Sequence, residues 1–145
     1  MTRDEISQAI DSAFAAYSAG DLDGFVADFA PDMVYEDNSR AEPLYGRDAF
    51  KAYAAGWFDA SSDGSIVPLR KIIEGGEAVA ELRFEATHDK APMYGVEATG
   101  TRFAFDFSII ASFADGKLTR LKAFYNPVPV MRALGVVGTL PSSPT

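Results

Sequence analysis

The sequence contains no cysteine and a single histidine, His88. The absence of cysteine excludes disulfides, thiolate nucleophiles and sulfur-ligated metals. One histidine cannot form the usual metal site or nucleophile–base pair. The sequence also has no glycine-rich phosphate loop, no metal-ligand spacing and no serine–histidine–aspartate order. We therefore predict a protein with no metal and no other cofactor, whose stability depends on its hydrophobic core alone.

Basic residues and long apolar runs are also scarce. The chain has 13 lysines and arginines against 21 acidic residues, and its formal net charge is −8. Nucleic acid is an unfavourable partner for such a chain, because binding to phosphates requires basic side chains. No apolar stretch approaches the roughly 20 residues of a spanning helix, and residues 1–20 are amphipathic rather than continuously apolar. We expect no membrane partner and a cytoplasmic location.

The first 60 residues show the period of helices. Thr2 and Glu5 have the spacing of a capping box, and apolar residues then recur at helical spacing until Gly20. A second, shorter helix is predicted from Asp21, ended by a turn at Pro31. A third helix follows a loop over residues 38–46, and its apolar face is wide and aromatic: Ala49, Phe50, Tyr53, Ala54, Trp57 and Phe58.

Strands are predicted by alternation and by turn residues. In the short run Met33 to Asp37, the side chains of Met33, Tyr35 and Asp37 share one face. Later, Gly75-Gly76 and Asp115-Gly116 each join two alternating runs, as expected of hairpins. Two inward rows result, one with Ala80, Leu82, Phe84, Ala86 and His88 and the other with Phe103, Phe105, Phe107, Ile109, Ala111 and Phe113.

This order of elements predicts an α+β fold. Three helices with one strand among them, followed by four long strands, favour a cone-shaped, curved antiparallel sheet with the helices on its concave face enclosing a pocket. We expect one domain over residues 1–135, including a short helix near residues 128–134. Residues 136–145 are predicted to form a flexible C-terminal tail.

Asp37 is the strongest candidate for a functional residue, because a carboxylate ends an otherwise apolar strand face. It could act as a general base toward a carbon acid. The alternative is a structural aspartate that caps or anchors the loop beginning at Asn38. Carboxylates in clefts favour a functional site without proving one.

Other candidates also have two interpretations. His88 could hydrogen-bond a ligand carbonyl or relay a proton at the cavity mouth, although a histidine at the end of a strand is more often structural. Tyr17, Tyr53, Trp57 and Tyr125 could line a pocket and donate hydrogen bonds. Aromatic residues at such spacing are usually part of the core, and we expect at least half of these to be core residues.

Four segments carry a family resemblance: Gly20-Asp21, Val34-Tyr35-Glu36-Asp37, Tyr45-Gly46-Arg47-Asp48-Ala49 and Phe113-Ala114-Asp115-Gly116-Lys117-Leu118. With them the chain resembles the SnoaL-like polyketide cyclases and ketosteroid isomerases, over about Ile6 to Gly135. The resemblance implies the fold of nuclear transport factor 2, a cystatin-like fold, with a pocket for a hydrophobic small molecule and a homodimer built on the outer sheet face near Ile110 and Phe124.

The resemblance also implies roles for single residues. Asp37 matches the aspartate that serves ketosteroid isomerases as general base. The helix-one tyrosine of those enzymes falls at Ala13 or Phe14, which leaves Tyr17 one turn away, and their second oxyanion donor corresponds to Ile109. The histidine and aspartate of SnoaL-type cyclases fall at Ile109 and Ala123. The substrate-binding residues we predict are Tyr35, Tyr53, Trp57, Phe84, Phe105, Phe107, Ile109 and Tyr125.

Two hypotheses of different classes follow. In the first, the chain is a cofactor-free enzyme that moves a proton next to a carbonyl of a steroid, polyketide or terpenoid-like substrate, with Asp37 as base and Tyr17, Tyr125 or His88 as hydrogen-bond donor. In the second, it is a non-catalytic protein that binds a small molecule in the same pocket.

Overall fold

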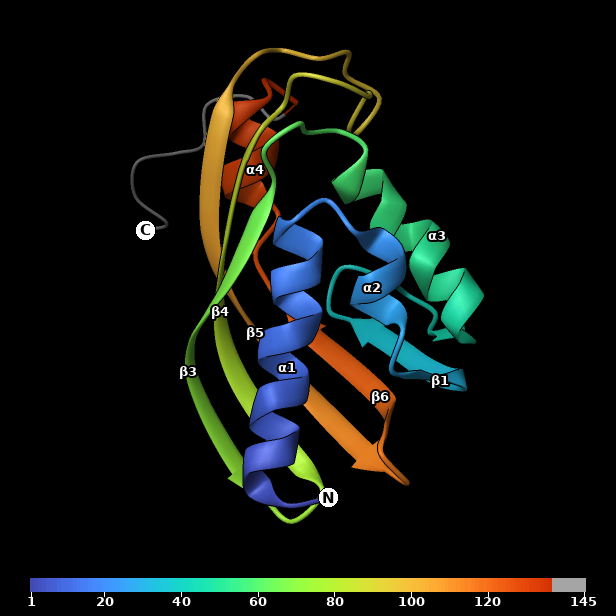
Figure 1. Ribbon diagram of the computed structural model, residues 1–145. Helices are drawn as coiled ribbons and strands as arrows, with labels where there is room; N and C mark the ends of the chain where they lie inside the picture. The colour runs from blue at the N-terminus through green and yellow to red at the C-terminus, as the bar shows by residue number, and fades with distance from the viewer. Residues whose placement is uncertain (137–145) are drawn as a thin grey trace, which may run out of the picture.

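A computed structural model describes residues 1–136, and the predicted tail over residues 136–145 lies outside this range except for its first residue. The described part is an α+β fold built on a curved, open sheet of strand order β2-β1-β6-β5-β4-β3. Helices α1, α2 and α3 lie over one face of the sheet, and α4 packs near its upper end (Figure 1). The elements are α1 (Arg3–Ser18), α2 (Leu22–Val26), β1 (Phe29–Asp37), β2 (Leu44–Tyr45), α3 (Arg47–Phe58), β3 (Ser65–Glu74), β4 (Glu77–Thr87), β5 (Arg102–Ala114), β6 (Lys117–Phe124) and α4 (Val128–Ala133).

The predicted start of α1 is confirmed. The Thr2 hydroxyl accepts a hydrogen bond from the Glu5 backbone at 3.1 Å, and the Glu5 carboxylate accepts one from the Thr2 backbone at 2.9 Å. Both hairpins are confirmed as well. Asp115 and Gly116 have φ values of 53° and 78°, the left-handed pair that a two-residue hairpin turn requires.

The inward rows of β4 and β5 are also as predicted. Leu82 and Phe84 are 0% and 3% exposed, and they pair with Phe107 and Phe105 on the neighbouring strand. Phe105 and Phe107 are half-buried and pack against the same core. The core therefore lies between the sheet and the three helices, as the alternation indicates.

The beginning of the sheet differs from the prediction in three ways. The turn expected at Pro31 is wrong, because Pro31 lies inside β1, in the stretch where its register with β6 is irregular and no amide donor is required. A two-residue strand, β2, occurs within the predicted loop 38–46 and pairs with β1. The sheet is antiparallel except at the β1–β6 pair, which is parallel.

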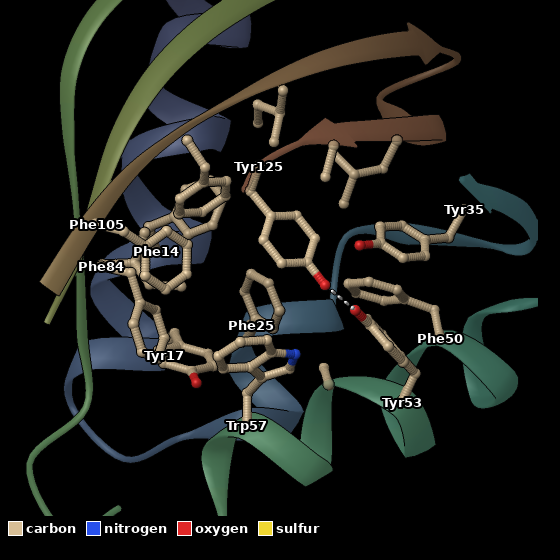
Figure 2. Close-up of a pocket in the computed structure, with 16 residues that line it drawn as sticks. Phe14, Tyr17, Phe25, Tyr35, Phe50, Tyr53, Trp57, Phe84, Phe105 and Tyr125 are labelled. Atoms are coloured by element: carbon tan, nitrogen blue, oxygen red, sulfur yellow. Dashed lines mark hydrogen bonds between the residues drawn. The ribbon is translucent and has the colours of Figure 1, made fainter. Parts of the chain in front are cut away.

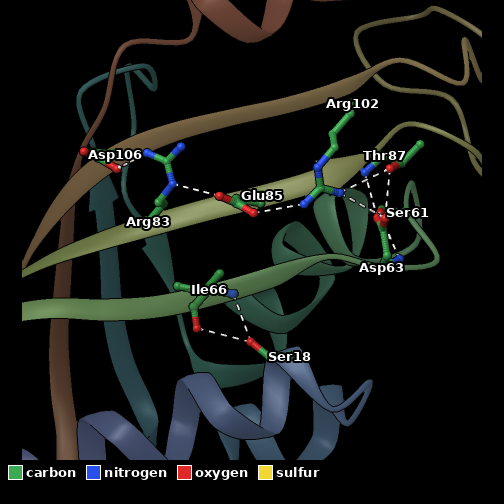
Figure 3. A network of polar contacts seen from close by, with 9 residues as sticks. All are labelled: Ser18, Ser61, Asp63, Ile66, Arg83, Glu85, Thr87, Arg102 and Asp106. Carbon is green, nitrogen blue, oxygen red and sulfur yellow. Dashed lines mark hydrogen bonds and ion pairs between the residues drawn. The ribbon is translucent and has the colours of Figure 1, made fainter.

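The outer face of the sheet carries a ladder of charges along β4 and β5 (Figure 3). Arg83 binds Glu85 and Asp106, and Arg102 binds Glu85 and Asp63. Asp63 also accepts hydrogen bonds from the backbone and hydroxyl of Thr87 at 2.7 and 2.8 Å. The Thr87 amide, with Ser61 and the Thr87 hydroxyl, lowers the pKa of Asp63 to about 2. Through Asp63, the ladder fixes the connection between α3 and β3 to the ends of β4 and β5.

Leu82→Ala is predicted to lower the free energy of unfolding by about 2–5 kcal/mol, because it opens a void in a fully buried site. Glu81→Ala is the matched control, since Glu81 is exposed on the opposite face of the same strand, and its effect should stay within about 0.5 kcal/mol. Urea denaturation followed by circular dichroism measures both values. Equal effects of the two substitutions would contradict the assignment of inner and outer faces.

Candidate functional site

A cavity of about 90 Å³ lies between the helices and the concave face of the sheet. Phe84 and Phe105 stack at its apolar end, with their ring centroids 5.4 Å apart. The hydroxyls of Tyr53 and Tyr125 meet at the other end, and the Trp57 indole nitrogen faces this same side (Figure 2). The lining is aromatic and aliphatic throughout: Phe14, Tyr17, Phe25, Tyr35, Phe50, Tyr53, Ala54, Trp57, Ile66, Phe84, Phe105, Phe107, Ile109, Leu121, Ala123 and Tyr125.

Asp37, the last residue of β1, organises the polar end. Its Oδ2 accepts hydrogen bonds from the hydroxyls of Tyr35 at 2.8 Å and Tyr53 at 3.1 Å. Its Oδ1 accepts from the Ser39 backbone at 2.8 Å and from the Ser39 hydroxyl at 2.6 Å. All four partners donate, an arrangement that suits an ionised carboxylate, which can only accept. The buried carboxylate thus joins β1, α3 and the loop after β1.

The hydrogen-bond network continues to Tyr125, and its donors and acceptors can be assigned. The Tyr125 hydroxyl lies 2.9 Å from Ser39 Oγ and 3.4 Å from the Tyr53 hydroxyl. Because Ser39 gives its single hydroxyl hydrogen to Asp37, it must accept from Tyr125. Asn38 holds Tyr125 in place, accepting from its backbone N–H and donating to its carbonyl, both at 3.0 Å. The lone pairs of the Tyr125 hydroxyl are therefore free to accept further hydrogen bonds.

Burial keeps these tyrosines neutral. It raises the pKa of the Tyr35 hydroxyl well above its usual range, and the adjacent Tyr53 and Asp37 act in the same direction. Burial and the Tyr125 hydroxyl likewise raise the pKa of Tyr53. Both side chains are therefore hydrogen-bond donors rather than phenolates at any physiological pH.

Asp37 is buried, at 6% exposed, as expected of a residue on the inner face of β1. It does not itself line the cavity. Its partners Tyr35 and Tyr53 do line the cavity. A ligand in the cavity would therefore meet the tyrosine hydroxyls before the carboxylate.

His88 is fully buried and does not line the cavity. Its Nε2 lies 2.9 Å from the Ala91 carbonyl, which can only accept, so Nε2 carries the hydrogen. Its Nδ1 lies 3.2 Å from the Thr99 hydroxyl and accepts from the Thr99 backbone at 3.4 Å. The catalytic role of His88 stays a prediction, and its place outside the cavity does not support it. Both ring nitrogens instead hold the loop between β4 and β5, which is the structural alternative.

Tyr17 contributes its ring to the cavity wall but not to the polar end. Its hydroxyl lies on the far side of the group from the Tyr53 and Tyr125 hydroxyls (Figure 2). The hydroxyl is buried and has no hydrogen-bond partner among the described residues. Burial raises the pKa of Tyr17 above its usual range, and the charge of Asp59 adds to this effect. This position gives Tyr17 no contact with the hydroxyls that could share a substrate oxygen.

Tyr17→Phe is predicted to raise the free energy of unfolding by about 1 kcal/mol, because it removes a buried hydroxyl that makes no hydrogen bond. Turnover and ligand affinity should stay at the wild-type level. Tyr53→Phe is the control, since the Tyr53 hydroxyl has a partner and its loss should be destabilising. Thermal unfolding and ligand titration measure these effects, and reduced turnover in Tyr17→Phe would show that the hydroxyl reaches the substrate.

The eight residues predicted to bind substrate all line the cavity: Tyr35, Tyr53, Trp57, Phe84, Phe105, Phe107, Ile109 and Tyr125. The sequence interpretation missed Ser39, which lies in a loop and gave no periodic signal. Ser39 follows Asp37 by two residues, and an aspartate side chain commonly accepts a hydrogen bond from the backbone N–H at this spacing. The spacing was therefore a local signal for this contact.

Comparison with known proteins decides the family. The model of the SnoaL-like domain matches residues 10–121. The chain belongs to the SnoaL-like family. The cavity of this family member is lined by Ile109 and Ala123. Both are apolar, whereas the resemblance to SnoaL-type cyclases would put a histidine and an aspartate at these positions. A comparison with curated protein sequences finds no match.

Solved structures share the fold of this SnoaL-like protein over nearly its whole length. AclR from Streptomyces galilaeus, for which a hydroxylase activity has been suggested, is 21% identical, with a TM-score of 0.86 over 97% of this chain and 91% of that one. TsrD from Streptomyces laurentii is 25% identical, with a TM-score of 0.80 over 94% and 99%. A protein from Jannaschia sp. CCS1, suggested to be a SnoaL-like polyketide cyclase, is 18% identical, with a TM-score of 0.82 over 93% and 94%.

Residues 1–136 contain no group of three or more histidine, cysteine, aspartate or glutamate side chains arranged to hold a metal ion. Among the helices of these residues, none has the length and apolar character needed to cross a membrane.

Proposed function

We propose that this SnoaL-like protein is an enzyme that moves a proton next to a carbonyl of an apolar small molecule, without a cofactor. The observation that carries the proposal is a set of hydrogen bonds at one end of an aromatic cavity, in which Tyr53 donates directly to Asp37 and Tyr125 connects to it through Ser39. An apolar ring system would fill the cavity, and a carbonyl oxygen would meet the only polar end of its wall. The family and the suggested activities of its relatives agree with a small-molecule substrate.

The proton path follows the hydrogen bonds. The carbon next to the carbonyl loses its proton to the Tyr53 hydroxyl oxygen, while Tyr53 passes its own hydrogen to Asp37 Oδ2. The electron pair left behind forms an enolate, and its oxygen accepts the hydrogen of Tyr125, which turns away from Ser39. Reversal at a second carbon returns the proton and completes an isomerisation. In a ring closure, the enolate carbon instead bonds to a second carbonyl carbon of the same molecule, and the oxygen of that carbonyl takes the proton. Because the raised pKa of Tyr53 disfavours a phenolate, the two transfers through Tyr53 occur together.

Asp37→Asn should reduce proton transfer by about two to four orders of magnitude, the usual scale of general-base catalysis. Exchange of hydrogen for deuterium next to the carbonyl of apolar ketones, followed by proton NMR in D₂O, measures this step without knowledge of the product. Tyr53→Phe should lose a similar factor, and the double variant should lose no more, because both residues serve one path. Tyr35→Phe is the control, since it removes a donor to the same Asp37 oxygen without cutting the path.

The non-catalytic alternative is favoured by one observation, the four donors that already occupy the oxygens of Asp37. A protein that only binds its ligand would bind the ketones and show no exchange in the wild type. Exchange in the wild type that survives in Asp37→Asn would remove Asp37 from the mechanism. The two hypotheses therefore differ in wild-type exchange, and the role of Asp37 is tested separately.

We also propose a homodimer built on the outer sheet face. Three exposed aliphatic residues, Ile72, Val79 and Ile110, pair across β3, β4 and β5 in one row. Phe124 is exposed on β6 and carries the Lys122 ammonium 5.3 Å from its ring centroid. An apolar row of this kind is typical of a surface that pairs with another protein.

Light scattering at micromolar concentration should give about twice the chain mass of 15.6 kDa. Ile110→Glu should give the single-chain mass, because it buries an unpaired charge at the centre of the proposed interface. Glu81→Ala, a change on the same face outside the apolar row, should remain dimeric. A wild-type particle of 15.6 kDa would contradict the proposal.

A further inference from the structure

A groove of about 510 Å³ lies directly outside the cavity. Its walls come from the loop after β1, from α3, from the loop between β4 and β5, and from the segment that leads into α4. Three residues, Tyr53, Trp57 and Tyr125, line both the groove and the cavity. The two spaces are therefore neighbouring parts of one site, separated by aromatic side chains.

The cavity alone is too small for a ligand of ordinary size, so the groove bears on what the site could bind. Sites for drug-sized ligands usually measure about 300–1,000 Å³. The cavity, at about 90 Å³, holds a single ring at most, whereas the groove is several times larger. A ligand of ordinary metabolite size with one end in the cavity must extend past Trp57 into the groove.

The groove has a definite charge. Arg40 is the only charged residue among those that line it, although the chain as a whole carries −8. The Arg40 guanidinium lies 5.2 Å from the centroid of the Tyr53 ring. It forms no ion pair with any other residue of the described range. A cation without a protein partner at the mouth of an apolar site suits an anionic ligand group.

The opposite wall is held in a conformation that L-residues rarely adopt. Tyr94 has φ 50°, followed by Gly95 at 73°, in a tight turn closed by the bridge between Met93 and Val96. This turn sets the Tyr94 ring edge-on to Trp57, with centroids 6.2 Å apart. Burial raises the pKa of Tyr94 to about 12, so its hydroxyl is a neutral donor. The groove thus has an aromatic wall and a cation facing a common space.

We propose that the groove holds the carboxylate of an elongated aromatic acid, with Arg40 as its partner, while the aromatic ring enters the cavity between Tyr53, Trp57 and Tyr125. This inference rests on the proposed function for its assumption that the cavity binds a small molecule. It adds the class of that molecule, an amphiphilic acid with an apolar ring at one end. Arg40 is then the residue that selects acids over neutral analogues.

The test uses Trp57, the single tryptophan of the chain, whose fluorescence reports binding at the junction of cavity and groove. The probes are ω-phenylalkanoic acids from phenylacetic to 6-phenylhexanoic acid, together with their methyl esters. The best acid should bind about tenfold more tightly than its ester, the scale of a partly exposed charge-assisted hydrogen bond. Affinity should pass through a maximum as the chain lengthens, when the carboxylate reaches Arg40 with the ring inside.

Variants separate the two parts of the site. Arg40→Gln should bring the acid-to-ester ratio to about one without weakening ester binding. Lys122→Gln removes the same charge on the outer face and should leave the ratio unchanged, which excludes an effect of net charge. Ala123→Val narrows the cavity and should weaken acid and ester together by a similar factor.

The possible failures are distinct. Equal binding of acid and ester by the wild type, or a preference for the acid that persists in Arg40→Gln, would overturn the inference and leave the cavity assignment standing. If none of the acids, esters and apolar ketones alters Trp57 fluorescence, the small-molecule function itself is contradicted, and this inference with it.

Discussion

The site depends on one buried carboxylate. Asp37 accepts four hydrogen bonds, and their donors come from β1 itself, from the loop that follows it and from α3. A charge in this position is tolerable only because each oxygen has two donors. The same bonds orient the tyrosine hydroxyls at the polar end of the cavity. Loss of the carboxylate would therefore disturb both the packing of α3 against β1 and the direction in which these hydroxyls point.

The remainder of the cavity is shaped by aromatic packing. Trp57 contacts Phe84, Phe105, Tyr94 and Tyr125 with ring centroids 5.6–6.2 Å apart. One α3 side chain therefore touches the sheet, the loop between β4 and β5, and the segment that follows β6. Such contacts add modest free energy beyond the area that they bury, but they restrict the geometry strongly. In the proposed function, the apolar wall would hold the body of a ligand and the few polar atoms would fix its orientation.

Sequence patterns predicted the parts of this fold that depend on local rules. Alternation in β4 and β5 identified the inner face, and the capping box placed the start of α1, because each rule involves residues close in the chain. The position of Pro31 is mispredicted because the strand accommodates this proline at a point where its register is irregular. The irregular register of β1 with β6 is not visible in any local pattern. The inward row of β4 predicts His88 at the cavity, whereas the loop that begins at His88 folds back and occupies both of its ring nitrogens. The hydrogen bond from Tyr53 of α3 to Asp37 also follows from no local sequence pattern.

The left-handed turn at Tyr94 has a consequence for how the protein balances stability against ligand contact. A tyrosine in this conformation costs about 1–2 kcal/mol relative to glycine, which adopts it freely. Glycine at this position would relax the backbone and remove the aromatic wall beside Trp57. The turn is therefore a place where a more stable chain and a better-formed groove require different residues, and the tyrosine here favours the groove.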